Sequence, residues 1–349
     1  MRKREKAQKL LLGQDLSEEV KKAAMHIRQG GLVAFPTETV YGLGGDALNK
    51  KSVENIYKAK GRPGDNPLIV HIACTCDFYK LALEPPPYAK ELIECFWPGP
   101  FTLVVRKNPE LPKWFGVHPD LESKTVGIRM PSNPVALSFI KESGCFIAAP
   151  SANIAGRPSS TSPKHIITDF PHHKDLGIYV LDGGASTLGL ESTVVDITGD
   201  KPVILRPGSV TPCQIEGVVG EVGKQLMQND APRSPGMKYK HYAPNAPVTL
   251  IDGTNENIAL FLSKKANEEH MGAIVFSETF EHLPESTKEN GVFFATKSDT
   301  YAKNLYENLR AFDSVKVATI YAQTMPTAGI GAAVMDRLYK ASEGRIINV

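Results

Sequence analysis

Apolar positions in the first half of the chain fall into short runs, separated by longer stretches with helical spacing. Short apolar runs predict buried strands, here at 32–35, 68–72, 101–105, 126–130, 178–181, 194–197 and 203–205. Helices are predicted near Asp15 to Gly30 and at 51–60, 88–96 and 134–142. This mixed order, with adjacent strands late in the half, predicts an α/β (α+β) fold in which helices cover a twisted mixed sheet.

The pattern changes after about residue 212, and a second α/β arrangement follows. Strands are predicted at 248–251, 272–276, 291–295 and 315–322, with helices at 255–267, 299–311 and 330–342. Residues 228–247 carry four prolines and no apolar periodicity, which indicates a linker, although a basic and aromatic one. With 349 residues there is room for two cores. We therefore predict a first domain at 1–212, a linker at 213–246 and a smaller second domain at 247–349.

Composition is that of an ordinary globular protein, with 22% charged and 42% hydrophobic residues. The net charge of +2 is too small to indicate general binding to nucleic acid or membranes, so anions would be bound by local clusters. The five cysteines form no C-x-x-C pair, which argues against a disulfide framework or a four-thiolate zinc site. Cys74 and Cys76 form a C-x-C that is either redox-active or, as we favour, a pair of small buried residues.

The segment MRKREKAQKLLLG at the start of the sequence is basic, but its apolar part is only three leucines long. That is too short for the core of a signal peptide. No apolar run approaches the length that spans a membrane. These features predict a cytoplasmic location.

Candidate chemistry lies where polar loops follow predicted strands, as is usual in α/β folds. After the first strand, Thr37 and Thr39 offer hydroxyls that bind a carboxylate or an amine, although a plain turn explains them equally well. Lys60 and Arg62 lie two apart on a turn with glycine and proline, which indicates either an anion clamp or a solvated basic turn. His71, in an apolar strand, is by itself typical of a core histidine.

Further along, an arginine stands inside an apolar strand. Arg129 requires an anionic partner, because an unpaired buried charge is costly, and both a structural carboxylate and a substrate carboxylate satisfy that requirement. The small and polar residues from Ala148 to Asn153, with Ser159 and Ser160 close behind, suit close approach to a nucleotide. Ser192 and Arg206 mark two more strand ends.

Familiar phosphate-binding and hydrolase motifs are missing from the sequence. It has no G-x-x-x-x-G-K-[ST] loop, no G-x-G-x-x-G after the first strand and no G-x-S-x-G elbow. No His/Cys set has zinc-ligand spacing. Phosphate would therefore be held by dispersed Lys, Arg and Ser side chains and by backbone N–H groups.

Taken in order, these clusters resemble the Sua5/YrdC family of threonylcarbamoyl-AMP synthases, in its long Sua5 form. The residues that carry the resemblance are FPTETVYGLGGDA (35–47), KGRPGDNPLIVHI (60–72), FWPGPFTLVV (96–105), TVGIRMP (125–131), APSANIAGRPSST (149–161), ESTVVD (191–196), LRPGSVT (205–211) and SPGMKYKHYAP (234–244). The last of these is the signature of the long form. The resemblance spans nearly the whole chain and implies a YrdC-like first domain and a Rossmann-like second domain.

The resemblance also implies roles for individual residues. The family's K-x-R and S-x-N signature falls on Lys60, Arg62, Ser151 and Asn153, and the first two would be catalytic. The implied ATP-binding residues are Lys60, Arg62, Asn66, Thr125, Ser151, Asn153, Ser159, Arg206 and Tyr242. The implied L-threonine-binding residues are Thr39, His71, Arg129, Ala149 and Ser192, with Arg129 on the substrate carboxylate.

The implied reaction joins L-threonine, bicarbonate or CO2, and ATP. The threonine amine captures the carbon, the resulting N-carboxylate attacks the α-phosphorus of ATP, and pyrophosphate leaves. Mg2+ would arrive with ATP rather than be held by protein ligands, and the linker would close as a lid. The product would pass to the machinery that transfers threonylcarbamoyl to tRNA position 37 (t6A), without stable nucleic-acid binding or a membrane.

Two other functions fit parts of the sequence. The same cations could bind tRNA or double-stranded RNA, because a fold alone does not decide function. Carbamoyl transfer, as in hydrogenase-maturation proteins with a related domain, is a second alternative, but those proteins carry acylphosphatase and zinc-finger modules that this sequence lacks. The C-terminal domain shows no active-site pattern, and its role stays open.

Overall fold

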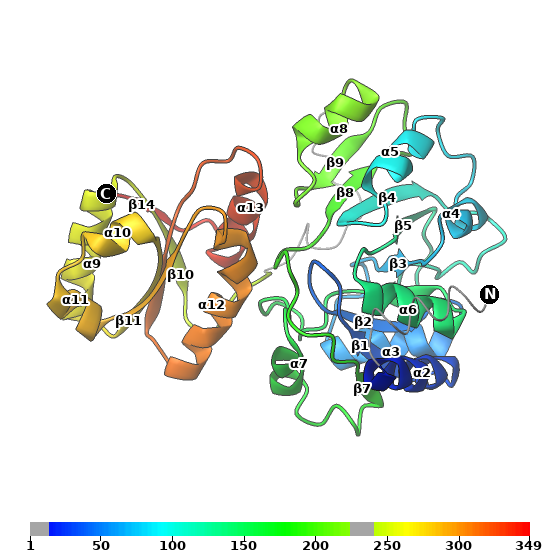
Figure 1. Ribbon diagram of the computed structural model, residues 1–349, viewed down its shortest axis with the longest axis horizontal. Helices are drawn as coiled ribbons and strands as arrows, with labels where there is room; N and C mark the ends of the chain where they lie inside the picture. The colour runs from blue at the N-terminus through cyan, green and yellow to red at the C-terminus, as the bar shows by residue number, and fades with distance from the viewer. Residues whose placement is uncertain (1–13, 224–240) are drawn as a thin grey trace. The chain divides into compact units, whose positions relative to one another are not determined.

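The computed structural model describes residues 14–223 and 241–349, which form two compact units (Figure 1). Of these residues, 14–155 and 160–223 belong to the first unit. The second unit contains 241–349 together with a short segment from the first half, Gly156–Ser159. The boundary between the units therefore crosses the chain more than once.

A mixed sheet of nine strands runs through the described part of the first unit, in the order β7-β1-β2-β6-β3-β5-β4-β8-β9. The strands are β1 (Leu32–Phe35), β2 (Gly42–Asp46), β3 (Ile69–His71), β4 (Phe101–Arg106), β5 (Thr125–Arg129), β6 (Ile147–Ala149), β7 (Ile178–Val180), β8 (Thr193–Asp196) and β9 (Val203–Arg206). The sheet contains parallel pairs such as β3–β5 and antiparallel pairs such as β4–β5, which confirms the predicted mixed sheet.

Helices of the first unit lie between these strands in the sequence. They are α2 (Gln14–Arg28), α3 (Lys50–Lys60), α4 (Thr75–Leu81), α5 (Ala89–Phe96), α6 (Pro134–Ser143), α7 (Pro163–Asp169) and α8 (Pro212–Val219). Helix α3 begins where the Asn49 side chain accepts hydrogen bonds from two N–H groups, and it ends at Gly61 with a φ of 60°, a conformation that favours glycine. This ending places Lys60 in the last turn and Arg62 just beyond it.

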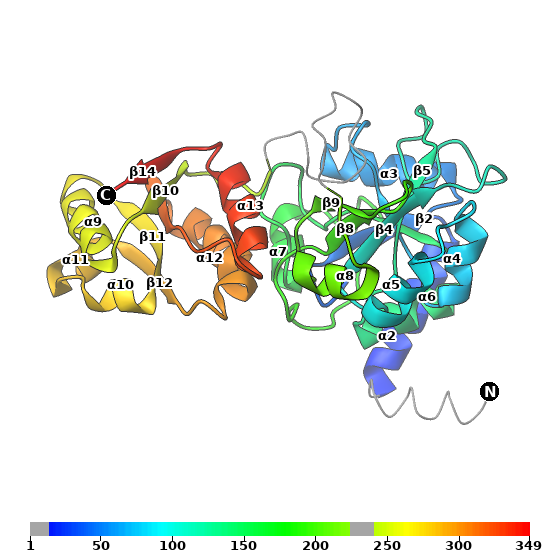
Figure 2. The same ribbon diagram turned by 90° about the horizontal axis from the view of Figure 1, so that it is seen from above.

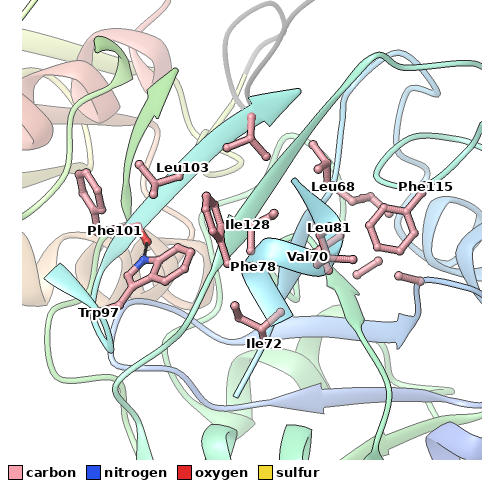
Figure 3. Packing of buried hydrophobic residues seen from close by; sticks show 14 of the residues in the cluster. Leu68, Val70, Ile72, Phe78, Leu81, Trp97, Phe101, Leu103, Phe115 and Ile128 are labelled. Carbon is pink, nitrogen blue, oxygen red and sulfur yellow. Dashed lines mark hydrogen bonds between the residues drawn. The ribbon is translucent and has the colours of Figure 1, made fainter. Parts of the chain in front are cut away.

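Successive side chains of each strand point to opposite faces of the sheet. On one face, Val70, Leu103 and Ile128 join a continuous apolar cluster with residues of α3, α4 and α5, part of which Figure 3 shows. On the other face, helices α2 and α6 cover β1 and β6 in a second apolar cluster, which contains Phe35 and Ile147. Apolar side chains therefore pack on the first face, whereas on the second face α2 and α6 cover β1 and β6.

Beyond β6 the second face turns polar. Its residues include Ile69 and His71 on β3, Gly127 and Arg129 on β5, and Thr102 on β4. His71 pairs with Ile147 of β6 on one side and with Arg129 of β5 on the other. The change from apolar to polar therefore occurs at His71, and the candidate site begins there.

The second unit contains a parallel sheet of five strands within its described residues, in the order β12-β11-β13-β10-β14. The strands are β10 (Val248–Asp252), β11 (Met271–Phe276), β12 (Val292–Thr296), β13 (Thr319–Gln323) and β14 (Ile346–Asn348). The helices are α9 (Asn255–Glu268), α10 (Ser277–Glu281), α11 (Glu285–Asn290), α12 (Tyr301–Val315) and α13 (Gly331–Ala341). Helices lie on both faces of this sheet, which confirms the expected α/β class (Figure 2).

The segment Gly156–Ser159 is held by contacts inside the second unit. The guanidinium of Arg157 pairs with Asp313 at 2.7 Å, and that of Arg310 donates to the carbonyl oxygen of Pro158 at 2.5 Å. The backbone N–H of Ala243 donates to the Gly156 carbonyl at 2.9 Å. Arg310 is buried, so its bond to the Pro158 carbonyl is shielded from solvent, whereas the Arg157 side chain is partly exposed.

Three strands escaped prediction from the sequence. Strand β2 contains three glycines, and β6 and β14 are three residues long, so none shows the apolar run that predicts a strand. The interpretation of Cys74 and Cys76 as buried was wrong, because both are exposed and they form a disulfide at the start of α4. The strand predicted at 315–322 begins at Thr319, since α12 continues through Val315.

Two further predictions concern membrane-spanning segments and the lid in the linker. Within residues 14–223 and 241–349, no helix combines the length and apolarity needed to cross a membrane. The lid residues Lys238, Tyr239 and Lys240 lie outside the described part of the chain.

Gly42 and Gly44 of β2 are needed because the ring of Phe35 lies against both of them. A Cβ at Gly44 would lie 2.7 Å from Cγ2 of Ile147 and 3.0 Å from Cε1 of Phe35. We expect Gly44→Ala to lower the free energy of unfolding by about 1–3 kcal/mol, the usual cost of overpacking. Both tryptophans, Trp97 and Trp114, are in the first unit, so urea unfolding followed by tryptophan fluorescence measures that unit. Gly144→Ala is a poor control because its φ is 66°, whereas Gly199→Ala meets no atom within 4 Å and should be nearly neutral.

Candidate active site

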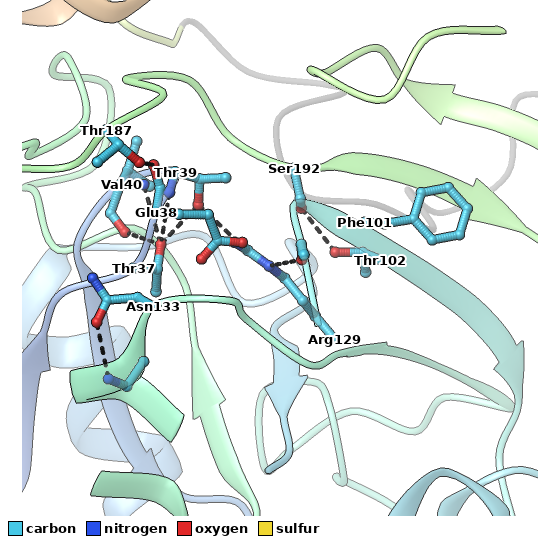
Figure 4. A network of polar contacts seen from close by, with 12 residues as sticks. Thr37, Glu38, Thr39, Val40, Phe101, Thr102, Arg129, Asn133, Thr187 and Ser192 are labelled. Carbon is cyan, nitrogen blue, oxygen red and sulfur yellow. Dashed lines mark hydrogen bonds and ion pairs between the residues drawn. The ribbon is translucent and has the colours of Figure 1, made fainter. Parts of the chain in front are cut away.

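Four polar side chains from neighbouring strands form a row on the second face of the first unit's sheet. Figure 4 shows three of them, Arg129, Thr102 and Ser192. Strand register pairs His71 with Arg129 and Arg129 with Thr102. The hydroxyl of Thr102 lies 2.8 Å from that of Ser192, just before β8. Since paired residues of adjacent strands point to the same face, the register alone brings His71, Arg129 and Thr102 together. Below we call His71, Arg129, Thr102 and Ser192 the polar row.

Arg129, at the centre of the polar row, is buried and fully oriented. Its Nη2 donates to Glu38 Oε1 at 2.6 Å, and its Nη1 donates to the hydroxyl of Thr39 at 2.8 Å. Its Nε donates to the Gly99 carbonyl at 3.2 Å. The anionic partner that the sequence required thus includes a structural carboxylate, Glu38, and binding of a substrate carboxylate by Arg129 stays a prediction.

The Glu38 carboxylate is held ionised by this contact. Burial by itself would raise its pKa, but the adjacent Arg129 guanidinium outweighs burial and keeps the pKa below its ordinary value. Nearby backbone N–H groups of Glu38 and Ser132 lower the pKa further. The pair is therefore a buried ion pair of opposite charges, which needs good geometry to offset its desolvation.

A tight turn presents Glu38 and Thr39 to Arg129. The Thr37 hydroxyl donates to the Val40 carbonyl at 2.6 Å and accepts from the backbone N–H groups of Thr39 and Val40, each at 3.2 Å. The hydroxyls of Thr37 and Thr39 lie 2.8 Å apart. The two threonines that the sequence offered as ligand hydroxyls thus also fix this turn by side-chain-to-backbone bonds.

His71 is a neutral member of the polar row. Burial, helped by the nearby positive charge of Arg129, lowers its pKa to about 3. Its ring meets Phe35 edge to face at 5.7 Å, and within the described residues its Nδ1 has no hydrogen-bond partner. At neutral pH this imidazole can exchange a hydrogen bond with a ligand, but it cannot neutralise a ligand's negative charge.

The two halves of the K-x-R and S-x-N signature meet in space. The ammonium of Lys60, at the end of α3, donates to the backbone carbonyls of Ser151, at 2.6 Å, and Asn153. In return the Lys60 carbonyl accepts from the N–H of Ala155 at 2.9 Å. One buried lysine therefore ties the end of α3 to the loop after β6, where Ala149 ends its strand.

Arg62 shapes the loop that leads into β3. Its Nε donates to the Asn66 carbonyl at 3.1 Å, and its Nη2 donates to the Pro67 carbonyl at 2.8 Å. The hydroxyl of Tyr57 also donates to the Asn66 carbonyl, at 3.0 Å. Asn66 is buried, and in the described part of the chain its Oδ1 has no hydrogen-bond partner, so it can accept a bond from a ligand.

Arg206 closes the far end of the polar row. Its Nη2 donates to the carbonyl of Ser192 at 3.0 Å and to the Ser192 hydroxyl at 3.2 Å. Together with the contact between Ser192 and Thr102, this forms a continuous polar chain from β9 to β4. The sequence predicted Ser192 and Arg206 separately, and the structure brings them into direct contact.

These four cations share one arrangement. Lys60, Arg62, Arg129 and Arg206 are all buried, and each donates to at least one backbone carbonyl of a loop at a strand or helix end. Arg129 differs from the other three in that it also has the Glu38 carboxylate as an ion-pair partner. The arrangement thus holds positive groups rigidly, as preorganised stabilisation of anions requires.

A cavity of about 670 Å3 lies on the same face of the sheet as the polar row. Thr102 belongs to both, and Thr125, Gly127 and Pro67 also line the cavity. Gly127 lines the cavity without a side chain. A Cβ at this position would lie 3.5 Å from its nearest atoms, on Ile69 and Thr102, which is ordinary van der Waals contact. Thr125, predicted to bind ATP, therefore lies in a hollow large enough for a small-molecule ligand.

Two of the predicted ATP-binding residues, Ser159 and Tyr242, belong to the second unit. The carbonyl of Ser159 accepts from Arg310 Nε at 3.4 Å. Tyr242 is buried and stacks on Tyr306 with ring centroids 5.4 Å apart, and the guanidinium of Arg337 lies 5.7 Å from the centre of its ring. Its predicted closure over ATP stays a prediction.

Three residues of the site were not predicted from the sequence. Glu38 lay inside the recognised motif, but nothing local linked it to Arg129, 91 positions away. Thr102 and Gly127 lie inside predicted apolar strands, and nothing in the sequence marks either as a site residue. The alternation of β4 and β5 was the available signal, because it assigns Thr102, Gly127 and Arg129 to one face.

The described residues form no cluster of metal ligands. No group of three or more His, Cys, Asp or Glu side chains among them is placed to hold a metal ion. Glu38, the carboxylate beside the polar row, forms an ion pair with Arg129, and Asp65 and Glu122 line the cavity.

Comparison with known proteins identifies the family. Residues 25–208 match the Sua5/YciO/YrdC family model, described as "Telomere recombination", and residues 210–343 match the model described as "Threonylcarbamoyl-AMP synthase, C-terminal domain". The chain belongs to the Sua5/YrdC family. The two matches together reproduce the long Sua5 form, which confirms the resemblance seen in the sequence.

Members of the Sua5/YrdC family are similar to the chain along most of its length. The threonylcarbamoyl-AMP synthase of Bacillus subtilis is 42% identical over 334 residues, covering 94% of each chain. That of Pyrococcus abyssi is 41% identical and covers 95% of this chain and 96% of its own. The crystal structure of P. abyssi Sua5 complexed with L-threonine superposes with a TM-score of 0.85 at 40% identity, covering 95% of this chain and 96% of that one.

The ion pair of Arg129 and Glu38 makes a testable contribution to stability. Arg129→Met leaves the Glu38 carboxylate buried without its cation, and we expect the free energy of unfolding to fall by about 3–5 kcal/mol. Adding Glu38→Leu removes the stranded charge, so the double variant should be more stable than Arg129→Met alone. Urea unfolding followed by tryptophan fluorescence measures both. A double variant that is as unstable as the sum of the single ones would contradict this account.

Proposed function

We propose that this protein makes threonylcarbamoyl-AMP and pyrophosphate from L-threonine, bicarbonate and ATP, as a nucleotidyltransferase. The observation that carries the proposal is the polar row, with Arg129 in it and Arg206 at its end, beside a cavity on the same face of the sheet that shares Thr102 with the row. Lys60 and Arg62 are buried at the end of α3 and just beyond it, and none of the four cations is among the residues that line the cavity. Membership of the Sua5/YrdC family, whose members here are named threonylcarbamoyl-AMP synthases, supports the proposal.

The chemistry explains why cations are needed. Bicarbonate, the threonine carboxylate and the ATP phosphates are all anionic, so the reactants repel one another. Lys60, Arg62 and Arg206 would offset that repulsion near the nucleotide, while Arg129 and neutral His71 would hold the threonine. Because no covalent intermediate is required, catalysis would consist of positioning and of stabilising the charge on the α-phosphoryl group.

Mg2+ enters this scheme as part of the substrate. The nucleotide would bind as its magnesium complex, and the ion would neutralise charge on the phosphates. Asn66 and Thr125 offer neutral oxygens to the nucleotide, and the buried cations offer charge. In this proposal the protein's own carboxylates do not need to coordinate the metal.

The geometry favours this proposal over RNA binding. Lys60, Arg62, Arg129 and Arg206 are buried and fixed by backbone carbonyls, whereas a nucleic-acid backbone is bound by cations at the surface. The match of 210–343 to a C-terminal domain of threonylcarbamoyl-AMP synthases argues against carbamoyl transfer of the hydrogenase-maturation type. We further propose that the product serves tRNA threonylcarbamoyl transfer, and the cytoplasmic location stays a prediction.

The proposed reaction is tested by measuring pyrophosphate. Purified protein with ATP, Mg2+, L-threonine and bicarbonate should release pyrophosphate, and omission of either L-threonine or bicarbonate should stop the release. L-Serine, which lacks the methyl group, serves as the comparison amino acid. Release that continues without an amino acid would show simple ATP hydrolysis and would refute the proposal.

The cavity is tested by filling its floor at Gly127. Gly127→Val places methyl groups where the nucleotide would lie, and overpacking by about 1–3 kcal/mol should raise the KM for ATP roughly five- to hundredfold. Gly127→Ala adds only a Cβ at ordinary contact distance and is the matched control, with a much smaller effect. An unchanged KM for ATP in a folded Gly127→Val protein would place the nucleotide elsewhere.

A further inference from the structure

The buried pair of Arg129 and Glu38 keeps bonding capacity that its own contact does not use. Glu38 is only 7% exposed, and its Oε1 receives the bond from Arg129. Within the described residues, the second oxygen, Oε2, is buried and has no hydrogen-bond partner. The backbone N–H groups that lower the pKa of Glu38 form no hydrogen bond with this oxygen. A buried carboxylate oxygen without a donor is costly unless a ligand supplies one.

Arg129 has capacity on its own side as well. A guanidinium carries more N–H groups than the bonds to Glu38, Thr39 and Gly99 require. The pair thus presents a donor group and an acceptor oxygen side by side on the face of the sheet that carries the polar row. A ligand that matches it must carry an acceptor anion and a donor close together.

A free amino acid has this arrangement, because its carboxylate and its ammonium group are attached to one carbon atom. A lone arginine would recognise the carboxylate of any carboxylic acid. An arginine paired with a carboxylate also recognises the ammonium group, which only donates hydrogen bonds. A zwitterion has no net charge, so it can bind beside a neutral ion pair without leaving an uncompensated charge in the protein interior.

We infer that Glu38, through Oε2, accepts a hydrogen bond from the amino group of the amino-acid substrate and thereby selects an α-amino acid and orients its amine. The inference rests on the proposed function, since it names a further specificity-determining residue of that site. Glu38 differs from the other polar groups nearby in carrying a negative charge. Neutral His71 can accept a hydrogen bond but offers no charge to an ammonium group, and the Thr39 hydroxyl is already engaged by Arg129 and Thr37.

The test compares two ligands that differ only at the amine. One is L-threonine, and the other is 2,3-dihydroxybutanoate of the same stereochemistry, in which a hydroxyl replaces the ammonium group. Titration calorimetry without ATP or bicarbonate should show that the wild-type protein prefers L-threonine. Glu38→Gln keeps the shape and an acceptor oxygen for Arg129 but removes the negative charge. Loss of a charged hydrogen bond should lower the affinity for L-threonine roughly ten- to hundredfold and leave that for the analogue nearly unchanged.

Controls separate recognition from structure. Glu91→Gln, at an exposed position of α5, makes the same chemical change and should behave as wild type. Steady-state kinetics of Glu38→Gln should show a raised KM for L-threonine with the KM for ATP unchanged. If the variant lost affinity for both ligands equally, Glu38 would serve only to support Arg129, and the inference would be overturned. An unaltered preference for L-threonine would overturn it as well.

The wild-type protein alone also tests the inference, should Glu38→Gln fail to fold. Equal affinity for L-threonine and its dihydroxy analogue would show that no group of the site binds the amino group selectively. This binding measurement is independent of turnover. A protein that prefers L-threonine but releases no pyrophosphate would contradict the proposed function and leave the inference supported, whereas no binding of L-threonine at all would overturn both.

Discussion

The need to give every buried cation a partner governs the site of this protein. A guanidinium or ammonium group removed from water is destabilising until hydrogen bonds replace its hydration. Backbone carbonyls of the surrounding loops accept hydrogen bonds from Lys60, Arg62 and Arg206. Arg129 donates to the Gly99 carbonyl and, in addition, pairs with the Glu38 carboxylate. Because the loops supply these carbonyls, folding of the loops and placement of the charges are one event. The positive groups are therefore in position before any anion arrives, which is the condition for electrostatic catalysis.

The sheet determines where this arrangement can exist. Helices α2 and α6 pack over β1 and β6 on the second face, and the polar row begins at His71 on the neighbouring strand. The opposite face carries a continuous apolar cluster, so the strands stay fixed while one side of β3, β5 and β4 is free of that packing. Strand register then aligns His71, Arg129 and Thr102 at adjacent positions without help from the loops. A rigid sheet thus holds one substrate site, and loops at the strand ends add the charges.

Much of this could be predicted from the sequence, for identifiable reasons. The strands with apolar runs were predicted because burial on both faces leaves a continuous signal, as in Leu32–Phe35. The glycine-rich β2 was not, since its place in the sheet depends on the close approach of Phe35 rather than on propensity. Arg129 was predicted to need an anion, but its partner Glu38 is distant in sequence, and only the fold shows the contact. The roles of the ATP-binding residues rest on the family resemblance and stay predictions.

The short segment Gly156–Ser159 has a consequence for any attempt to divide the molecule. Its carbonyls and the Arg157 side chain take their partners from Arg310, Asp313 and Ala243 of the second unit. A polypeptide cut after residue 223 would carry this segment with those partners missing, including an unpaired arginine. Separately produced halves would therefore not be two intact modules: the N-terminal half would carry Gly156–Ser159 without these contacts, and the C-terminal half would lose the bond from Arg310 to the Pro158 carbonyl.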